Sequence, residues 1–137
     1  MSKESNIEAQ KKFGEAANTG NWDLLKDVVA TDSIDNDPAP GQVSGPEGYE
    51  YFFKQLKSAF PDLEISVVHM VADEENVAFA YEVTGTHQGD FMGISPSGKS
   101  IKVRGMQISK FEDGKMVERW GSSDELGILK QIGFQLN

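Results

Sequence analysis

Apolar side chains recur at helical spacing in the first part of the chain. A helix is predicted over residues 5–18, with Ser5 and Glu8 as a capping box and Gly20 as its end. A short second helix is expected next, with Asn21 as its cap. Its apolar face is formed by three residues: Trp22, Leu25 and Val29.

A loop-rich segment precedes a third predicted helix. Residues 32–45 combine acids and amides with prolines and glycines, so one short strand followed by a loop is expected there. Ser44 and Glu47 have the spacing of a capping box, Pro46 suits a first turn, and Pro61 ends the pattern. The residues between them place one apolar stripe on this helix: Tyr49, Phe52, Phe53, Leu56 and Phe60.

From Asp62 onward the apolar period changes to two, which indicates half-buried strands. The polar stretch 73–76, the longer stretch 88–99 and the pair Asp113–Gly114 are predicted to connect them. Four consecutive antiparallel strands result. Helices followed by such a meander predict an α+β fold in which a curved sheet covers its helices.

Composition and charge limit the domain count and the partners. With 137 residues, 38% of them hydrophobic, the chain can form one compact core, so a single domain over 1–137 is expected. A net charge of −9 argues against nucleic-acid and membrane-surface binding. No signal-peptide pattern and no apolar run of about 20 residues occur, so a cytoplasmic location is expected. The lack of cysteine excludes disulfides and thiolate chemistry.

Two local patterns suggest ligand sites that their surroundings do not support. GISPSGKS at 93–100 has the letters of a phosphate-binding loop, but that motif needs a following helix, whereas Ser100 leads into a strand pattern. His69 and His87 have no acid or second histidine at ligand spacing, so no metal site is expected. His69 is interpreted as a surface residue at a strand end. For His87, a structural role and a place at a pocket mouth both stay open.

Asp124 has two interpretations. At the end of a strand that carries Arg119 and Trp120, its carboxyl group could face an apolar cavity and act as a base next to a carbonyl. It also precedes Leu126 and Ile128, which fit a short terminal helix that its carboxylate would cap.

Strand parity divides the sheet residues between two faces. If Gly121 points inward, so do Arg119, Gln107 and Val103, and the outward face then carries three apolar residues: Trp120, Met106 and Ile108. Such a surface favours a homodimer through the outer face of the sheet. The inward aromatic residues are expected to form core or to line a small-molecule pocket.

Three long segments, at 36–63, 84–106 and 111–134, carry a resemblance to a known family: NDPAPGQVSGPEGYEYFFKQLKSAFPDL, TGTHQGDFMGISPSGKSIKVRGM and FEDGKMVERWGSSDELGILKQIGF. Through them the chain resembles the SnoaL-like polyketide cyclases, in the superfamily of nuclear transport factor 2 and ketosteroid isomerase. The resemblance implies an NTF2-like cone, with three to four helices packed on a strongly curved, mainly antiparallel sheet. It also implies ring closure by an intramolecular aldol reaction without cofactor or metal, with an aspartate as acid and base.

Departures from the family pattern at Gly121, Asn36 and Gln107 bear on the chemistry of the site. The closing strand of the family commonly reads E-H-W-D-x-x-D, whereas this chain has Glu118-Arg119-Trp120-Gly121-Ser122-Ser123-Asp124, so Gly121 replaces the first acid. Asn36 and Gln107 stand where relatives have or could place a histidine, and neither side chain titrates near neutral pH.

The resulting hypothesis is a cyclase or isomerase-type protein acting on a small apolar carbonyl compound. Asp124 is the candidate base, Gln107 and Arg119 are the candidate oxyanion donors, and the other expected pocket residues are Trp22, Asn36, Phe53, Tyr81 and His87. The alternative is a non-catalytic module that binds a small molecule, which the loss of an acid at Gly121 supports. A third hypothesis is a protein-docking role like that of the transport-factor relatives.

Overall fold

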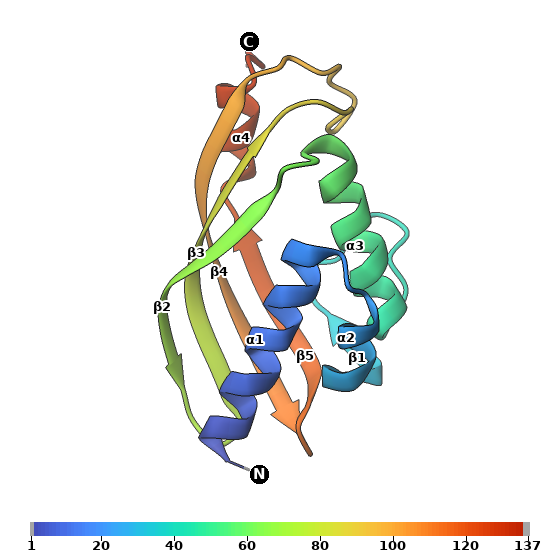
Figure 1. Cartoon of the computed structure of the whole chain (residues 1–137), viewed down its shortest axis with the longest axis vertical. Helices are drawn as coiled ribbons and strands as arrows, with labels where there is room; N and C mark the ends of the chain where they lie inside the picture. Colours follow the sequence, from blue (N-terminus) through green and yellow to red (C-terminus); the bar gives the residue numbers. More distant parts are fainter. Residues whose placement is uncertain (1, 136–137) are drawn as a thin grey trace.

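The computed structural model describes residues 2–135, which form four helices and five strands. Helices α1, α2 and α3 lie on one side of a strongly bent sheet, and α4 lies near the end of the chain (Figure 1). This arrangement confirms the predicted α+β fold. Along the chain the elements are α1 (Lys3–Thr19), α2 (Asp23–Val28), β1 (Val29–Asp35), α3 (Pro46–Ala59), β2 (Glu64–Ala72), β3 (Asn76–Thr86), β4 (Ser100–Glu112), β5 (Lys115–Ser123) and α4 (Glu125–Gln131).

The predicted helices exist, but three of their starts differ from the prediction. The capping box of α1 joins Ser2 and Ser5, not Ser5 and Glu8. Gly20 ends α1 in the left-handed region, as predicted. Asn21 does not cap α2, which begins after Trp22 without a side-chain cap, and Val29 opens β1 instead of extending the helix.

The start of α3 depends on a glycine, not on the predicted Ser44 cap. Gly45 is the N-cap residue, with φ of 84°, and a Cβ atom there would collide with the carbonyl oxygen of Thr31. The chain therefore enters α3 through a conformation that glycine adopts freely, close against β1. Pro46 occupies the first turn, and the helix ends at Ala59, before Pro61.

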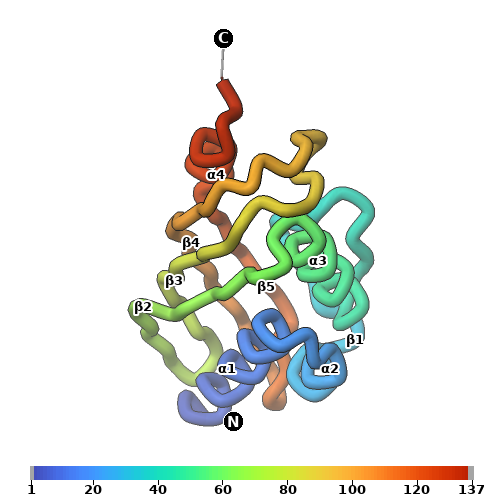
Figure 2. The backbone as a smooth tube through the Cα atoms, turned by 45° about the horizontal axis from the view of Figure 1, so that its top comes forward, coloured from blue at the N-terminus to red at the C-terminus, as the bar shows by residue number. Residues whose placement is uncertain are grey.

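The sheet has the strand order β1-β5-β4-β3-β2. The four strands from β2 to β5 pair antiparallel in sequence order, which confirms the predicted meander. The first strand, β1, pairs parallel with β5, with Asp35 opposite Arg119. Figure 2 shows that these two segments, from distant parts of the chain, lie beside one another.

Side chains alternate along β4 and β5 as the parity argument predicted. Val103, Gln107 and Arg119 are buried, whereas Met106, Ile108 and Trp120 are exposed. The register agrees, since Gln107 is opposite Gly121, and Ile108 is opposite Trp120. The inner face of the sheet is therefore the one that the helices cover.

The buried apolar side chains form two clusters. One includes Phe13 and Phe53, where α1, α2 and the first part of α3 meet the sheet. The other includes Phe60 and Val83, near the end of α3, and reaches α4. Ile65 and Phe79 pack against both clusters, so these two residues mark the boundary between them.

The connection between β3 and β4 is a loop without a helix. The segment 93–100 leads directly into β4, which begins at Ser100, so the helix that a phosphate-binding loop requires does not follow it. His69 lies on the surface, as expected, but inside β2 and not at its end. Within residues 2–135, no helix is both long and apolar enough to cross a membrane.

Candidate functional site

A cavity of about 460 Å³ lies between the helices and the inner face of the sheet. Its walls include Phe13 and Phe53 from the first core cluster and Tyr81 and Val83 from the second. Most of the lining is apolar; the sheet contributes the polar residues Gln107, Arg119 and Ser123, and the other polar residues come from α1. The cavity thus occupies the region where the two clusters would otherwise meet.

The rim of this cavity is formed by α1 and β2. The exposed residues among its lining are Lys11, Glu15 and Thr19 on α1 and Val67 on β2. No residue of the loop 88–99 belongs to the lining. A ligand would therefore reach the cavity between α1 and the edge strand, and not beneath that loop.

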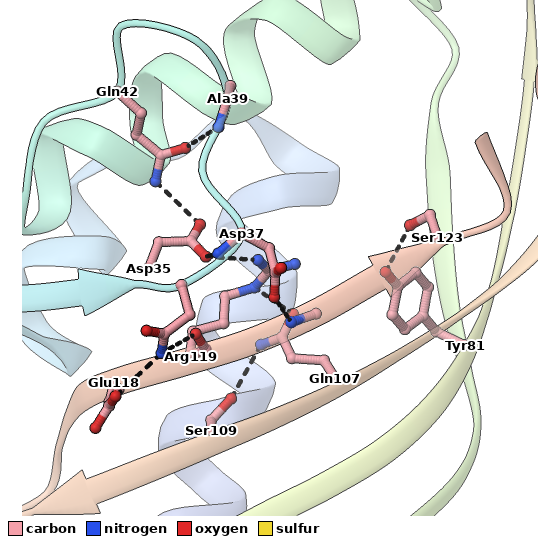
Figure 3. A network of polar contacts seen from close by, with 12 residues as sticks. Asp35, Asp37, Ala39, Gln42, Tyr81, Gln107, Ser109, Glu118, Arg119 and Ser123 are labelled. Atoms are coloured by element: carbon pink, nitrogen blue, oxygen red, sulfur yellow. Dashed lines mark hydrogen bonds and ion pairs between the residues drawn. The ribbon is translucent and has the colours of Figure 1, made fainter.

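Arg119 is the central polar group of the site (Figure 3). Its side chain is nearly buried, and Nη1 lies 3.0 Å from Oδ1 of Asp35 in an ion pair. Nε donates a 2.8 Å hydrogen bond to Oε1 of Gln107, and the guanidinium group lies 5.5 Å from the ring centroid of Phe52. Three different elements, β1, β4 and α3, therefore fix the orientation of this side chain.

Further hydrogen bonds hold the two partners of Arg119. The carboxylate of Asp35 also accepts from the backbone N–H of Asp37 at 3.0 Å and from Nε2 of Gln42 at 3.0 Å. Gln107 donates from Nε2 to the hydroxyl of Ser109 at 2.9 Å. Because each buried partner has at least one further hydrogen bond of its own, the group as a whole is held in place.

Gly121 lies directly against the guanidinium group. A Cβ atom on this residue would stand 2.6 Å from Cζ of Arg119, so any side chain would displace the guanidinium. The backbone N–H of Gly121 donates a 2.8 Å hydrogen bond to Oδ2 of Asp37, and Figure 3 shows the Asp37 side chain beside Arg119. A carboxylate from the loop after β1 therefore lies next to the position where the family pattern has its first acid.

A second polar pair lies on the sheet wall. The hydroxyl groups of Tyr81 and Ser123 are 2.7 Å apart, and both residues line the cavity (Figure 3). The Tyr81 ring lies over Gly105, where any side chain would collide with it. The Tyr81 hydroxyl can therefore reach Ser123 only because residue 105 is a glycine.

Tyr49 is buried behind the ion pair. Burial raises the pKa of its phenol far above the usual value, and the negative charge of Asp35 raises that pKa further. Neither Tyr49 Oη nor the neighbouring Ser33 Oγ has a hydrogen-bond partner among the described residues. Burial and the charge of Asp35 therefore hold the phenol neutral.

Four of the eight predicted site residues line the cavity: Phe53, Tyr81, Gln107 and Arg119. Trp22 does not, because its ring stacks on Phe53, with centroids 6.5 Å apart, as part of the core. Asn36 is exposed, and its amide donates to Glu118 and to the carbonyl oxygen of Arg119.

His87 and Asp124 also lie outside the cavity lining. His87 is fully buried, where Nδ1 accepts from Ser97 N–H at 3.1 Å and the ring packs on Phe60, which favours its structural interpretation. Asp124 is exposed, and its Oδ1 accepts from Gly127 N–H at 2.8 Å, which confirms that it caps α4.

Sequence reasoning missed Asp35, Asp37, Ser123 and Gln10. A signal for Asp35 was present, because a buried arginine needs a carboxylate, and the predicted short strand offered one. A signal for Gln10 was its place on the buried face of α1, four residues after Asn6 and three before Phe13. Asp37 and Ser123 gave no such signal. In residues 2–135, no group of three or more histidine or acidic side chains could hold a metal.

Comparison with known proteins agrees with this architecture. The structure superposes on TsrD from Streptomyces laurentii with a TM-score of 0.89, at 23% identity over 98% of this chain and 99% of that one. It superposes on IdmH from Streptomyces antibioticus with a TM-score of 0.82, at 26% identity over 93% and 98% of the two chains. The first likeness shows the fold alone.

Sequence comparison gives the family. The aklanonic acid methyl ester cyclase DauD from Streptomyces sp. (strain C5) is 25% identical over 135 residues, which cover 93% of this chain and 81% of DauD. The profile of the SnoaL-like polyketide cyclases matches residues 7–132. The cone-shaped fold, with polar residues of its sheet at the cavity, agrees with this match. Because the profile covers most of the sequence, the chain belongs to the SnoaL-like polyketide cyclase family.

Proposed function

We propose that the protein is a cofactor-independent cyclase that closes a ring in an apolar carbonyl compound by an intramolecular aldol reaction. The observation that carries this proposal is the Arg119–Gln107 pair, buried and rigid at the wall of an apolar cavity. Relatives named as aklanonic acid methyl ester cyclases, DauD and DnrD, support the reaction type. A compound with several carbonyl groups is therefore the proposed substrate class.

The donors would act on the negative charge that develops during the reaction. Arg119 uses two guanidinium N–H groups for Asp35 and Gln107, and the others remain available to a carbonyl oxygen in the cavity. The Gln107 amide has a second N–H besides the one bonded to Ser109. One such preorganised donor typically contributes about 3 kcal/mol to stabilising the transition state, because it needs no reorientation.

The proton acceptor in the proposal is Asp37, in place of the sequence-based candidate Asp124. Asp37 is exposed and, like Asp124, does not itself line the cavity, but it accepts from Gly121 N–H beside Arg119, whereas the Asp124 carboxylate caps α4. The Asp37 carboxylate would take a proton, directly or through one water, from a carbon between two carbonyls. The enolate carbon would attack a second carbonyl of the same molecule, and the resulting alkoxide would receive the proton from Asp37.

The test uses aklanonic acid methyl ester, the substrate named for the two relatives, and follows its cyclisation by chromatography. Asp37→Asn keeps a hydrogen-bond acceptor for Gly121 N–H but removes the charge, so kcat should fall by about 10²-fold or more. Gln107→Leu should lower kcat by about 10²-fold. Asp124→Asn is the matched control and should stay within a few fold of the wild type.

Two results would overturn parts of this proposal. A loss of turnover in Asp124→Asn, with Asp37→Asn unaffected, would return the base role to Asp124. Binding of the ester without any turnover by the wild-type protein would favour the non-catalytic binding module.

We also propose that a second copy of the chain covers the outer face of the sheet. Met106, Ile108 and Trp120 are 58%, 47% and 40% exposed, and the register places Ile108 beside Trp120. Ala78 and Ala80 continue this surface on β3. Light scattering during gel filtration should show a dimer that Ile108→Glu dissociates, whereas Leu126→Glu, a change at an exposed residue of α4, should leave it intact.

A further inference from the structure

Tyr81 and Ser123 form a hydroxyl pair at the cavity that the mechanism above does not use. Both residues line the cavity, Tyr81 is 6% exposed, and the two hydroxyl oxygens lie 2.7 Å apart. One hydroxyl therefore donates to the other, and this bond uses only one of the two O–H hydrogens. Neither hydroxyl has another hydrogen-bond partner among residues 2–135. The pair thus keeps one O–H donor for a ligand.

A glycine holds this pair at the wall of the cavity. The preceding inward positions of β4, Ile101 and Val103, carry buried apolar side chains. At Gly105 the Tyr81 phenol takes the space of a side chain, and its hydroxyl reaches across β4 to Ser123 on β5. Phenylalanine and alanine would fill the same space, so packing alone does not explain the two hydroxyls.

The hydroxyl pair lies one inward position along the sheet from the Arg119–Gln107 pair (Figure 3). Gly105 is opposite Ser123, and Gln107 is opposite Gly121. Two residues of a strand span roughly 7 Å. No hydrogen bond joins the two donor groups in the part of the chain that the structure describes. The wall therefore offers two separate donor sites to one ligand.

The proposed ring closure places negative charge on two oxygen atoms of one molecule. Removal of a proton places charge on the enolate oxygen. Attack of the enolate carbon on the second carbonyl then forms the new C–C bond and moves the C=O π electrons onto the oxygen of that carbonyl. A donor that is already oriented stabilises such an oxygen without reorganisation. Two donor sites on one wall therefore match the two oxygens.

We infer that Tyr81 donates its O–H to the oxygen of the attacked carbonyl, while Arg119 and Gln107 bind the enolate oxygen. This inference rests on the proposed function. Tyr81 is assigned as the donor because a phenol is a stronger hydrogen-bond donor than an aliphatic hydroxyl. Ser123 then donates to Tyr81 Oη and directs the phenolic hydrogen into the cavity. Tyr81 keeps its proton, and the alkoxide receives its proton from Asp37.

The test measures kcat and KM for aklanonic acid methyl ester in variants that lack one hydroxyl. Tyr81→Phe keeps the ring over Gly105 and removes only the donor, so kcat should fall by about 10²-fold while KM stays within about threefold. Ser123→Ala leaves the phenol without its partner, so kcat should fall less, by about threefold to tenfold. The double variant should be no slower than Tyr81→Phe, because both changes act through one donor. The matched control is Tyr51→Phe, which removes a phenol hydroxyl outside the cavity and should keep the kcat of the wild type.

A stability measurement separates catalysis from a structural role. Tyr81→Phe loses one hydrogen bond, so its melting temperature should fall by at most about 5 °C. A much larger fall, with kcat and KM both changed, would assign the hydroxyl to the fold and overturn the inference. A larger loss of kcat in Ser123→Ala than in Tyr81→Phe would also overturn it. If Tyr81→Phe does not fold, Ser123→Ala decides alone, and an unchanged kcat in that variant contradicts the inference.

Failure of the inference and failure of the proposed function give different results. Turnover that falls in Asp37→Asn and Gln107→Leu but not in Tyr81→Phe overturns the inference alone. A wild-type protein without turnover overturns both, because no carbonyl is then attacked. Turnover that is lost in Tyr81→Phe and kept in Asp37→Asn supports the inference and overturns the assigned base.

Discussion

The guanidinium group of Arg119 occupies the space that a side chain on Gly121 would need. A Cβ atom at residue 121 would stand 2.6 Å from Cζ of Arg119, although the two residues are only two positions apart on β5. The glycine and the buried arginine therefore depend on one another. This dependence accounts for the missing acid at residue 121, because the carboxylates near Arg119 come from Asp35 and Asp37 instead.

Gly121→Ala should displace the guanidinium group from its partners. We expect a loss of about 1–3 kcal/mol in the free energy of unfolding, because the ion pair with Asp35 and the bond to Gln107 are disturbed. The kcat for the proposed reaction should fall at least tenfold. Urea denaturation and steady-state kinetics measure these effects. Ser122→Ala, at the next and outward-facing position, is the control and should leave both quantities nearly unchanged.

Removing the charge of Asp35 should be among the most destabilising single changes in the chain. The side chains of Arg119 and Asp35 are only 8% and 4% exposed, so Asp35→Asn leaves a buried positive charge without its partner. The expected loss is about 3–5 kcal/mol in the free energy of unfolding. The double variant Asp35→Leu/Arg119→Met removes both charges and should regain much of this stability. A double variant no more stable than Asp35→Asn would contradict the assignment of the loss to the unpaired charge.

Because the phenol of Tyr49 is buried, we expect the folded protein to lose stability at alkaline pH. Burial, together with the charge of Asp35, raises the pKa of its phenol, so the folded protein keeps this proton above pH 10 while the unfolded chain loses it. The contribution of the neutral Tyr49 phenol to the free energy of unfolding is complete below about pH 10 and falls by about 1.4 kcal/mol per pH unit above it. Tyr49→Phe should unfold less readily than the wild type in urea above pH 10. Parallel pH profiles for the two proteins would count against this explanation, and Tyr51→Phe, on the exposed side of α3, is the control.

A large side chain at Gly14 should fill the cavity. This residue lines the cavity from α1, and a Cβ atom there would have no neighbouring atom within 4 Å. Gly14→Ala should stabilise α1 by about 1 kcal/mol and leave ligand binding intact. Gly14→Phe should lower the affinity for aklanonic acid methyl ester by at least tenfold without unfolding the protein. Unchanged affinity in Gly14→Phe would place the ligand elsewhere, and circular dichroism checks the fold.

The order and type of the main elements were predictable, because they depend on local periodicity. The stripe from Tyr49 to Phe60 and the alternation along β4 each have one dominant period, and both predictions agree with the structure. The helix starts were less predictable. Ser44 has the right chemistry for a cap, but the close approach of residue 45 to Thr31 decides where α3 begins, and this contact joins distant parts of the chain.

Half of the candidate site was predictable, because strand parity is a local property, whereas contacts between distant parts of the chain are not. Parity along β4 and β5 placed Gln107 and Arg119 on the inner face, and both line the cavity. Periodicity could not show that β1 pairs with β5, so the ion pair to Asp35 and the approach of Asp37 to Gly121 were missed. For Asp124 and His87 the sequence left two roles open, because the roles differ only in the direction of the side chain. In the folded chain that direction is set by Gly127 N–H for Asp124 and by Ser97 N–H for His87.

The parallel pairing of β1 with β5 also fixes when the site can form. Asp35 and Arg119 are 84 residues apart, and their strands are the first and the last of the sheet in sequence order. During synthesis on a ribosome, α1 to β4 can emerge while β1 still lacks its neighbour. The Asp35–Arg119 contact therefore reports completion of the sheet, and a nascent polypeptide that ends before β5 has no assembled donor pair to offer a ligand.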